Sequence, residues 1–179
     1  MSRIPSAKRE ELSPKHQQIW DHIHAARSGG GGPYSILMHV PALAGHVAAT
    51  EDYFRLDSAL SDADREIVIL AAARELGARY PWVRHEARAR QAGVRLEVIE
   101  TLRAKGPIAG FTAREKLLAE IPLSLLRDRS LSDELFSRAE RELSRRQLVE
   151  VIALVGHYST IGFVANAFEL PAPAGSQTF

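Results

Sequence analysis

The fold is decided by two consecutive segments, Ser61-Asp-Ala-Asp-Arg-Glu-Ile-Val-Ile-Leu-Ala-Ala-Ala-Arg-Glu-Leu-Gly77 and Tyr80-Pro-Trp-Val-Arg-His-Glu-Ala-Arg-Ala-Arg-Gln-Ala-Gly93. Both are interrupted by an ionisable side chain in a stretch that otherwise predicts buried helix. Glu66 directly precedes seven apolar residues, and His85 lies in line with small and aromatic residues three or four positions apart. This spacing places them on one helical face. Since carboxylates are rarely buried without a partner, Glu66 and His85 are the first candidates for chemistry.

The rest of the chain predicts further helices. They cover about residues 14–26, 41–56, 61–77, 79–93 and 96–104, followed by helices that begin at Thr112, Ser132 and Ser144. Thr112-x-x-Glu115 and Ser144-x-x-Gln147 are capping boxes. In a capping box, each of the two side chains accepts a hydrogen bond from the backbone N–H of the other residue. Pro122 is expected to kink or end its helix, and the last helix is expected to end near Leu170.

These elements predict an all-α, single-domain bundle of about eight helices over residues 1–179. The last helix is apolar on nearly every side between Leu148 and Phe168, which is typical of a central buried helix. We find no alternating pattern that predicts strands. Residues 28–33, with four successive glycines, are expected to form a flexible loop, and residues 171–179 an unpacked tail. A phosphate loop is disfavoured because no Lys-Ser/Thr pair follows the glycines.

Composition excludes several classes of function. The 179 residues are 45% apolar and 25% charged, with a formal net charge of +1. This balance gives no electrostatic case for binding nucleic acid or an anionic membrane. No apolar run is expected to reach the roughly 18 residues that span a bilayer. The absence of cysteine excludes disulfides and thiol chemistry, and with no apolar leader it favours a cytoplasmic protein.

The two segments can bring Glu66 and His85 together. If they form an antiparallel hairpin about Ala78, the two residues are offset by four or five positions, or roughly 6–8 Å along the axis. That gap is short enough for a direct contact or one bridging water. The alternatives are ordinary: Glu66 could pair with Arg65 or Arg74, and His85 could be a hydrogen-bonded core residue.

The other histidines divide into groups. His16, His22 and His24 share the first helix, but their spacing does not present two imidazoles on one face, so no metal site and no cofactor is predicted. His39 lies near the start of the second helix and could face a pocket. His157 lies in the most apolar helix, where it is either a satisfied core residue or a third polar member of the same pocket.

Aromatic residues around His85 are candidates for substrate binding. Trp82, Tyr80 and Tyr158 would be pocket walls in an enzyme and are otherwise ordinary core aromatics. Four arginines surround the fourth helix, namely Arg79, Arg84, Arg88 and Arg90, and most of them are expected to be solvated or to lie at a subunit contact. One of them could bind a substrate carboxylate through its fork of N–H donors.

The chain also resembles a known family over about residues 32–173. The motifs that carry the resemblance are Gly32-Pro-Tyr-x-x-Leu-Met-His-x-Pro-x-Leu43, Leu60-x-x-x-x-Arg-Glu-Ile-x-Ile-Leu70, Tyr80-x-Trp-x-x-His85 with Ala89-x-x-Ala-Gly93, and Leu148-Val-Glu-x-x-x-Leu-x-Gly-x-Tyr158. Together they are similar to the carboxymuconolactone decarboxylase-like family, whose core is shared with alkylhydroperoxidase D-like proteins. The resemblance implies the fold of that family.

In thiol-active members the pattern is a Glu, then Cys-x-x-Cys, then a His four residues later. Glu66 and His85 fit the outer positions, whereas Ala78 and Pro81 stand where the cysteines would be. Peroxide reduction by a disulfide cycle is therefore excluded. Cysteine-free relatives commonly have an acidic residue before the Trp, and the sequence leaves open how Pro81 affects the start of its helix.

What remains is the decarboxylase-like side of the family. The resemblance implies a cofactor-free lyase or isomerase that acts on a small carboxylated lactone or related metabolite, with His85 as proton donor or acceptor and Glu66 as its partner. The alternative is a non-catalytic ligand-binding or assembly scaffold of the same fold. The resemblance, and the number of apolar helix faces, also imply a homo-oligomer such as a trimer or hexamer.

Overall fold

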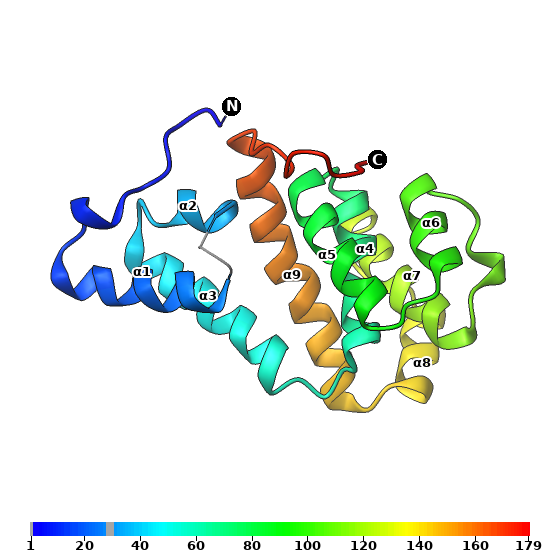
Figure 1. Ribbon diagram of the computed structural model, residues 1–179. Helices are drawn as coiled ribbons and strands as arrows, with labels where there is room; N and C mark the ends of the chain where they lie inside the picture. Colours follow the sequence, from blue (N-terminus) through cyan, green and yellow to red (C-terminus); the bar gives the residue numbers. More distant parts are fainter. Residues whose placement is uncertain (1, 28–30) are drawn as a thin grey trace.

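The computed structural model describes residues 2–27 and 31–179, and this part of the chain contains nine α-helices, two short 3₁₀ turns and no strand (Figure 1). The elements are η1 (Arg9–Glu11), α1 (Pro14–Ala26), α2 (Pro33–Leu37), α3 (Pro41–Leu56), α4 (Asp62–Glu75), α5 (Arg79–Gln91), α6 (Leu96–Ala104), η2 (Ile108–Gly110), α7 (Ala113–Arg127), α8 (Asp133–Glu142) and α9 (Arg145–Ala167). The predicted all-α fold class is confirmed.

One of the nine helices in the described residues, α2, was not predicted from the sequence. It has five residues, too few to show helical periodicity, and Pro33 occupies its first position. All five residues are buried. At the start of α2, the backbone N–H of Ser35 donates to the Gly32 carbonyl. The Ser35 carbonyl accepts a hydrogen bond from the backbone N–H of Ala7, near the N-terminus. Tertiary packing therefore stabilises a helix that is too short to form alone.

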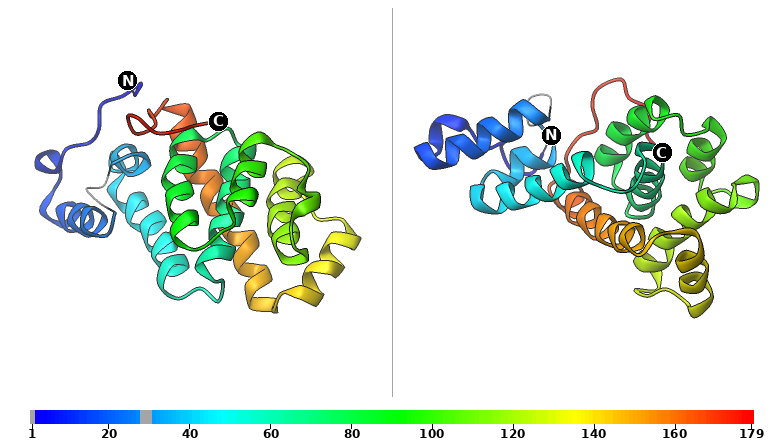
Figure 2. Two further views of the ribbon diagram at one scale, coloured as in Figure 1. Left: turned by 45° about the vertical axis from the view of Figure 1, so that its right-hand side comes forward. Right: turned by 90° about the horizontal axis from the view of Figure 1, so that it is seen from below.

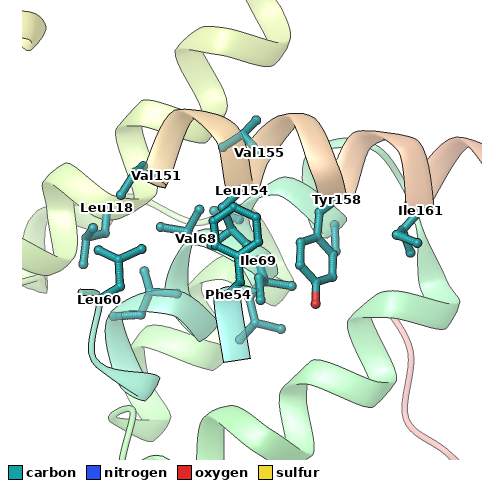
Figure 3. Packing of buried hydrophobic residues seen from close by; sticks show 14 of the residues in the cluster. Phe54, Leu60, Val68, Ile69, Leu118, Val151, Leu154, Val155, Tyr158 and Ile161 are labelled. Atoms are coloured by element: carbon teal, nitrogen blue, oxygen red, sulfur yellow. The ribbon is translucent and has the colours of Figure 1, made fainter. Parts of the chain in front are cut away.

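The core is built around α4 and α9. Helix α4 packs against α5, α6, α7 and α9, and every residue from Glu66 to Ala73 is buried. Helix α9 crosses the molecule and also contacts α2 and α3, so it joins the N-terminal helices to the rest (Figures 1 and 2). Its inward row includes Leu154, Tyr158 and Ile161 (Figure 3). The expectation of a central C-terminal helix is correct.

Helices α4 and α5 form the hairpin expected from the sequence. Gly77 takes a positive φ of 65°, which ends α4 in a conformation that favours glycine. Ala78 is fully buried and is the residue before α5. Pro81 is the third residue of α5 and does not disturb it, because the first N–H groups of a helix have no partner within it. Helix α5 thus begins at Arg79, with Pro81 in its first turn.

Pro122 does not end its helix. Helix α7 continues through it to Arg127, and Pro122 is buried together with Leu118 and Ile121. A proline inside a helix removes one backbone hydrogen bond to the preceding turn. Burial of this apolar face against α4 and α9 outweighs that loss.

The chain ends differently from the prediction. Helix α9 ends at Ala167, three residues before the predicted end, because Glu169 adopts a positive φ of 52° and the Leu170 N–H turns back to the Ala165 carbonyl. The final residues are not an unpacked tail. The Phe179 ring lies edge-on to Trp82, 5.4 Å between centroids, and 4.2 Å from the Arg74 guanidinium.

Helix α9 also contradicts the expectation about apolar runs. By length and composition it could cross a membrane, with a mean hydropathy of 1.6 over its most apolar window. More than half of that window, 56%, is buried inside the protein. Its apolar character is accounted for by contacts with α4, α5 and α7.

The predicted glycine loop falls partly outside the described residues, since residues 28–30 are not among them. Gly32 is described and has a φ of 70°, which favours glycine. A Cβ atom there would overlap the Tyr80 ring. This glycine therefore allows the backbone before α2 to lie against the start of α5.

Candidate functional site

The structure brings Glu66 and His85 into direct contact. The Nδ1 atom of His85 lies 2.7 Å from Oε2 of Glu66, and only 3% of Glu66 and 5% of His85 are exposed. Glu66 is contributed by α4 and His85 by α5. The contact of α4 and α5 thus places a carboxylate and an imidazole together without an intervening water.

The other ring nitrogen of His85 faces two donors. The Tyr158 hydroxyl from α9 lies 3.0 Å from Nε2, and Nη1 of Arg88 lies 3.4 Å from it. A guanidinium can only donate hydrogen bonds, so Nε2 carries the lone pair. The tautomer that fits these contacts has its proton on Nδ1, donated to Glu66. Burial raises the pKa of Tyr158 well above its ordinary value, which keeps the hydroxyl protonated.

We call Glu66, His85 and Tyr158 the histidine cluster. All three line a cavity of about 220 Å³, together with residues of α3, α4 and α5. That volume accommodates a small metabolite. The cluster is therefore not a sealed core contact, because its polar atoms border a space that a ligand can occupy.

The charges around this cavity are nearly balanced. Its lining contains three arginines and three carboxylates, namely Arg55, Arg65, Arg88, Glu51, Asp62 and Glu66. Arg65 pairs with Asp62 at 2.9 Å, and Arg55 lies 3.9 Å from Glu51. Unlike Arg65 and Arg55, Arg88 forms no ion pair within residues 2–27 and 31–179. Its side-chain polar contact there is with His85. A half-buried arginine next to the imidazole is thus free to bind an anion.

A second buried group, which we call the arginine cluster, consists of Arg27, Tyr34 and Glu51. Oε2 of Glu51 accepts from Nε of Arg27 at 3.1 Å and from the Tyr34 hydroxyl at 2.7 Å. Burial by itself would raise the pKa of Glu51, but the hydrogen bond from Tyr34 and the charge of Arg27 outweigh it and lower that pKa. Glu51 is therefore ionised, and it borders the same cavity as His85.

Glu51 was not among the predicted site residues, although the sequence contains a signal for it. Glu51 interrupts an inward face of α3 that contains Ala44, Ala48 and Phe54, at spacings of three and four. This is the same irregularity that pointed to Glu66. Arg27 gave no such signal, because it follows the last turn of α1 and its role depends on the long-range contact with α3.

The other predicted binding residues lie in different surroundings. Tyr80 borders a second, smaller cavity beside His85. Trp82 is fully buried and packs against Phe179, so it supports α5 without bordering either cavity near His85. His39 is exposed and its Nε2 lies 2.9 Å from the Pro5 carbonyl, away from both cavities. The expectation that His39 faces the pocket is wrong.

His157 lies beside the cluster but does not line either cavity near His85. Its ring packs against Phe54 and Tyr158, with centroids at 6.1 Å and 5.2 Å. Burial lowers its pKa to about 4, and its Nε2 has no hydrogen-bond partner in the described structure. His157 is thus a neutral core imidazole at neutral pH.

Metal binding finds no support in the described part of the chain. Among residues 2–27 and 31–179 no group of three or more His, Asp or Glu side chains is arranged to hold a metal ion. The other polar side chains in contact with His85 are Tyr158 and Arg88, and neither residue type is a usual metal ligand. The arrangement is suited to proton transfer instead.

Comparison with solved structures identifies the fold. A peroxidase-related protein from Ralstonia eutropha, described as an alkylhydroperoxidase AhpD core, has a TM-score of 0.78 at 17% identity, over 97% of this chain and 93% of its own. A peroxidase-related protein from Silicibacter sp. has a TM-score of 0.72 at 15% identity, over 95% and 92% of the two chains. The fold is therefore alkylhydroperoxidase D-like.

The sequence is also similar to a known family. Residues 38–121 match the model of the carboxymuconolactone decarboxylase family, a range that includes α3, α4 and α5 with Glu51, Glu66 and His85. The whole chain contains no cysteine. No curated protein matches the chain.

Proposed function

We propose that the protein is a cofactor-free acid–base enzyme, a lyase or isomerase that acts on a small carboxylated lactone or a related metabolite. The observation that carries the proposal is the contact between Glu66 and His85 at the wall of a 220 Å³ cavity. A buried carboxylate–imidazole pair that borders a ligand-sized space is the arrangement expected of a general base.

The proton chemistry follows from the hydrogen bonds. Neutral His85 presents the Nε2 lone pair and can remove a proton from carbon next to a carbonyl group, or return it to another carbon. The imidazolium formed in this step would be stabilised by the Glu66 carboxylate, which also fixes the ring orientation. For this step the substrate must displace the Tyr158 hydroxyl from Nε2. The displaced hydroxyl keeps its proton and can donate to an oxygen on which negative charge develops.

Arg88 supports the choice of a carboxylated substrate. It lines the cavity, lies beside the base and has no ion pair in the described chain. A guanidinium binds a carboxylate through two parallel N–H donors, which fixes both position and orientation. Arg88 would thus hold the substrate carboxylate while His85 exchanges a proton with the neighbouring carbon.

A thiol peroxidase mechanism is excluded, although two structural neighbours are called peroxidase-related. The chain has no cysteine to be oxidised, and Ala78 and Pro81 occupy the positions of the family's paired thiols. Ala78 is fully buried immediately before α5 and carries no group that can be oxidised.

We propose further that the protein is cytoplasmic and forms a homo-oligomer, a trimer or hexamer. Exposed apolar side chains on two helices support association, since Val149 and Phe163 on α9 and Leu56 on α3 are 66%, 60% and 80% exposed. Analytical ultracentrifugation tests this assignment, and a monomer at micromolar concentration would contradict it.

The function is tested with a panel of carboxylated lactones and small keto acids. Thermal-shift screening selects ligands, since saturation at 100 times the dissociation constant raises the unfolding free energy by about 2.7 kcal/mol. Turnover of each ligand is then followed by absorbance and NMR. Glu66→Gln and His85→Gln are expected to abolish turnover, whereas His39→Gln, which alters an exposed imidazole, is the control.

Two results would contradict the enzyme assignment. The first is unchanged turnover in both Glu66→Gln and His85→Gln, which would remove these residues from the reaction. The second is tight binding of the panel without conversion of any member, which would favour the alternative, a ligand-binding scaffold of the same fold.

A further inference from the structure

A second, smaller cavity adjoins the one described above. Its volume is about 60 Å³, and it shares Glu51, His85, Arg88 and Tyr158 with the larger cavity. A water occupies about 30 Å³ in the liquid, so this space has room for a carboxylate group or for about two waters. The two cavities thus lie next to each other around the same imidazole.

The smaller cavity has an excess of positive charge. Three arginines, Arg27, Arg84 and Arg88, line it, but Glu51 is the one carboxylate among its described lining residues. The larger cavity has as many carboxylates as arginines. Since uncompensated charge in a confined, poorly solvated space attracts counter-ions, the smaller cavity favours an anion.

Arg27 is paired with two carboxylates, but one of its nitrogen atoms has no partner in the described part of the chain. Only 8% of Arg27 is exposed, and Nε and Nη2 donate to Glu51, to the Ala48 carbonyl at 2.9 Å and to Asp52 at 2.6 Å. Its Nη1 is buried and has no acceptor within the described residues. A buried N–H group without an acceptor is unfavourable, and an anion in the cavity that Arg27 lines would supply one.

The remaining donors come from α5. Arg84 is half-buried, lines the cavity and makes no ion pair or side-chain hydrogen bond within residues 2–27 and 31–179. It lies one helical turn before Arg88, which also has no carboxylate partner there. Tyr34 and Tyr80 add two hydroxyl groups to the wall.

From these observations we propose that the smaller cavity binds a carboxylate anion, held by Arg27, Arg84 and Arg88. The carboxylate is either a free small anion of the size of acetate or an acidic group of a ligand that also occupies the larger cavity. Binding to this site does not depend on the proposed reaction, since it uses the Nη1 donor of Arg27 and the guanidinium groups of Arg84 and Arg88, and not the proton of His85.

The proposal is tested by titrating the protein with sodium acetate, with sodium chloride at matched ionic strength as the reference. The side-chain ¹⁵N signals of Arg27 and Arg84 are expected to shift saturably with acetate. The variant Arg84→Gln removes a charge without breaking a recorded hydrogen bond, so the fold is retained. It should weaken acetate binding by about tenfold, as loss of one charge-assisted contact does.

The matched control is Arg79→Gln, which removes an exposed arginine from the same helix outside this cavity. It should bind acetate as the wild type does. Equal affinity in the wild type and Arg84→Gln, or shifts no larger with acetate than with chloride, would overturn the site.

A second titration, with succinate, distinguishes the source of the carboxylate. If one ligand occupies both cavities, succinate should bind at least tenfold more tightly than acetate and lose that advantage in Arg84→Gln. Equal affinities for the two anions support a site for a free anion. Failure of both anions to saturate the signals would contradict the proposal, irrespective of any result with lactones.

Discussion

The two buried polar clusters differ in what their protons can do. In the histidine cluster, Glu66 and Tyr158 contact opposite ring nitrogens of His85, and an imidazole can both donate and accept a proton. In the arginine cluster, Arg27 is permanently charged, and Glu51 is kept ionised by Arg27 and Tyr34.

Similar burial therefore has different consequences. When His85 takes up a proton, Glu66 already provides a compensating charge at 2.7 Å. A proton on Glu51 would instead leave the buried Arg27 with less compensation, which is unfavourable. Under the proposed function, proton transfer takes place among α4, α5 and α9, whereas the contact of Arg27 with α2 and α3 contributes to ligand recognition and stability.

The largest expected difference is in catalytic rate. With a substrate in hand, His85→Gln should lower kcat about 10³-fold, because it removes the general base. Tyr34→Phe, in the arginine cluster, should lower kcat by less than about tenfold, because it touches no reacting atom. Steady-state kinetics on both variants measure the contrast, and comparable losses would erase the division between the clusters.

The next expected difference is in stability, where the variant in the arginine cluster should have the larger effect. Glu51→Gln should lower the free energy of unfolding by about 3 kcal/mol, because it removes a charge that compensates buried Arg27. Glu66→Gln should lower it by about 1 kcal/mol, since the amide oxygen still accepts from neutral His85. Urea denaturation measures both, and a larger loss in Glu66→Gln would show that His85 is charged.

His157 is a third buried group, and it provides a test of how burial alone affects the dependence of stability on pH. The pKa of an imidazole is 6.5 in the unfolded reference, whereas burial lowers that of His157 to about 4. The unfolded chain therefore binds more protons, and stability falls as the pH decreases from 6.5 towards 4. From neutral pH to about pH 5 the loss is about 2 kcal/mol.

This loss is measured by urea denaturation across that pH range, above the range in which most carboxylates titrate. His157→Gln should flatten the dependence of stability on pH, whereas His39→Gln should retain it. An unchanged slope in His157→Gln would mean that the imidazole takes up a proton in the folded protein.

The smallest expected contrast is between two buried tyrosines. Tyr34→Phe should reduce the free energy of unfolding by about 1.5 kcal/mol, because its hydroxyl donates to the ionised Glu51. Tyr158→Phe removes a hydrogen bond to a neutral ring and should reduce it by about 0.5 kcal/mol. Equal losses, again by urea denaturation, would indicate that His85 and Glu51 carry similar charge.

Local patterns were sufficient to predict much of this molecule. The α4–α5 hairpin follows from two apolar stretches separated by Gly77, and the contact of Glu66 with His85 follows from their positions about that turn. The capping boxes at Thr112 and Ser144 are present as the sequence indicates. Periodicity and capping are short-range properties, so one sequence is enough to show them.

What was missed depends on long-range packing. Arg27 meets Glu51 across 24 residues, and α2 forms because its neighbours bury it. Pro122 stays helical for the same reason, although its local chemistry opposes a helix. His39 was placed wrongly because its position in the sequence does not determine which side of the α2–α3 connection it faces.

The measurement that tests the account most directly is the tautomer of His85, observed by long-range ¹H–¹⁵N correlation in the free protein at neutral pH. We expect a protonated Nδ1 and an unprotonated Nε2, with the Nδ1 proton strongly deshielded by Glu66 and less so in Glu66→Gln. An imidazole protonated at Nε2, or one unaffected by Glu66→Gln, would contradict the assignment of His85 as a base oriented by Glu66.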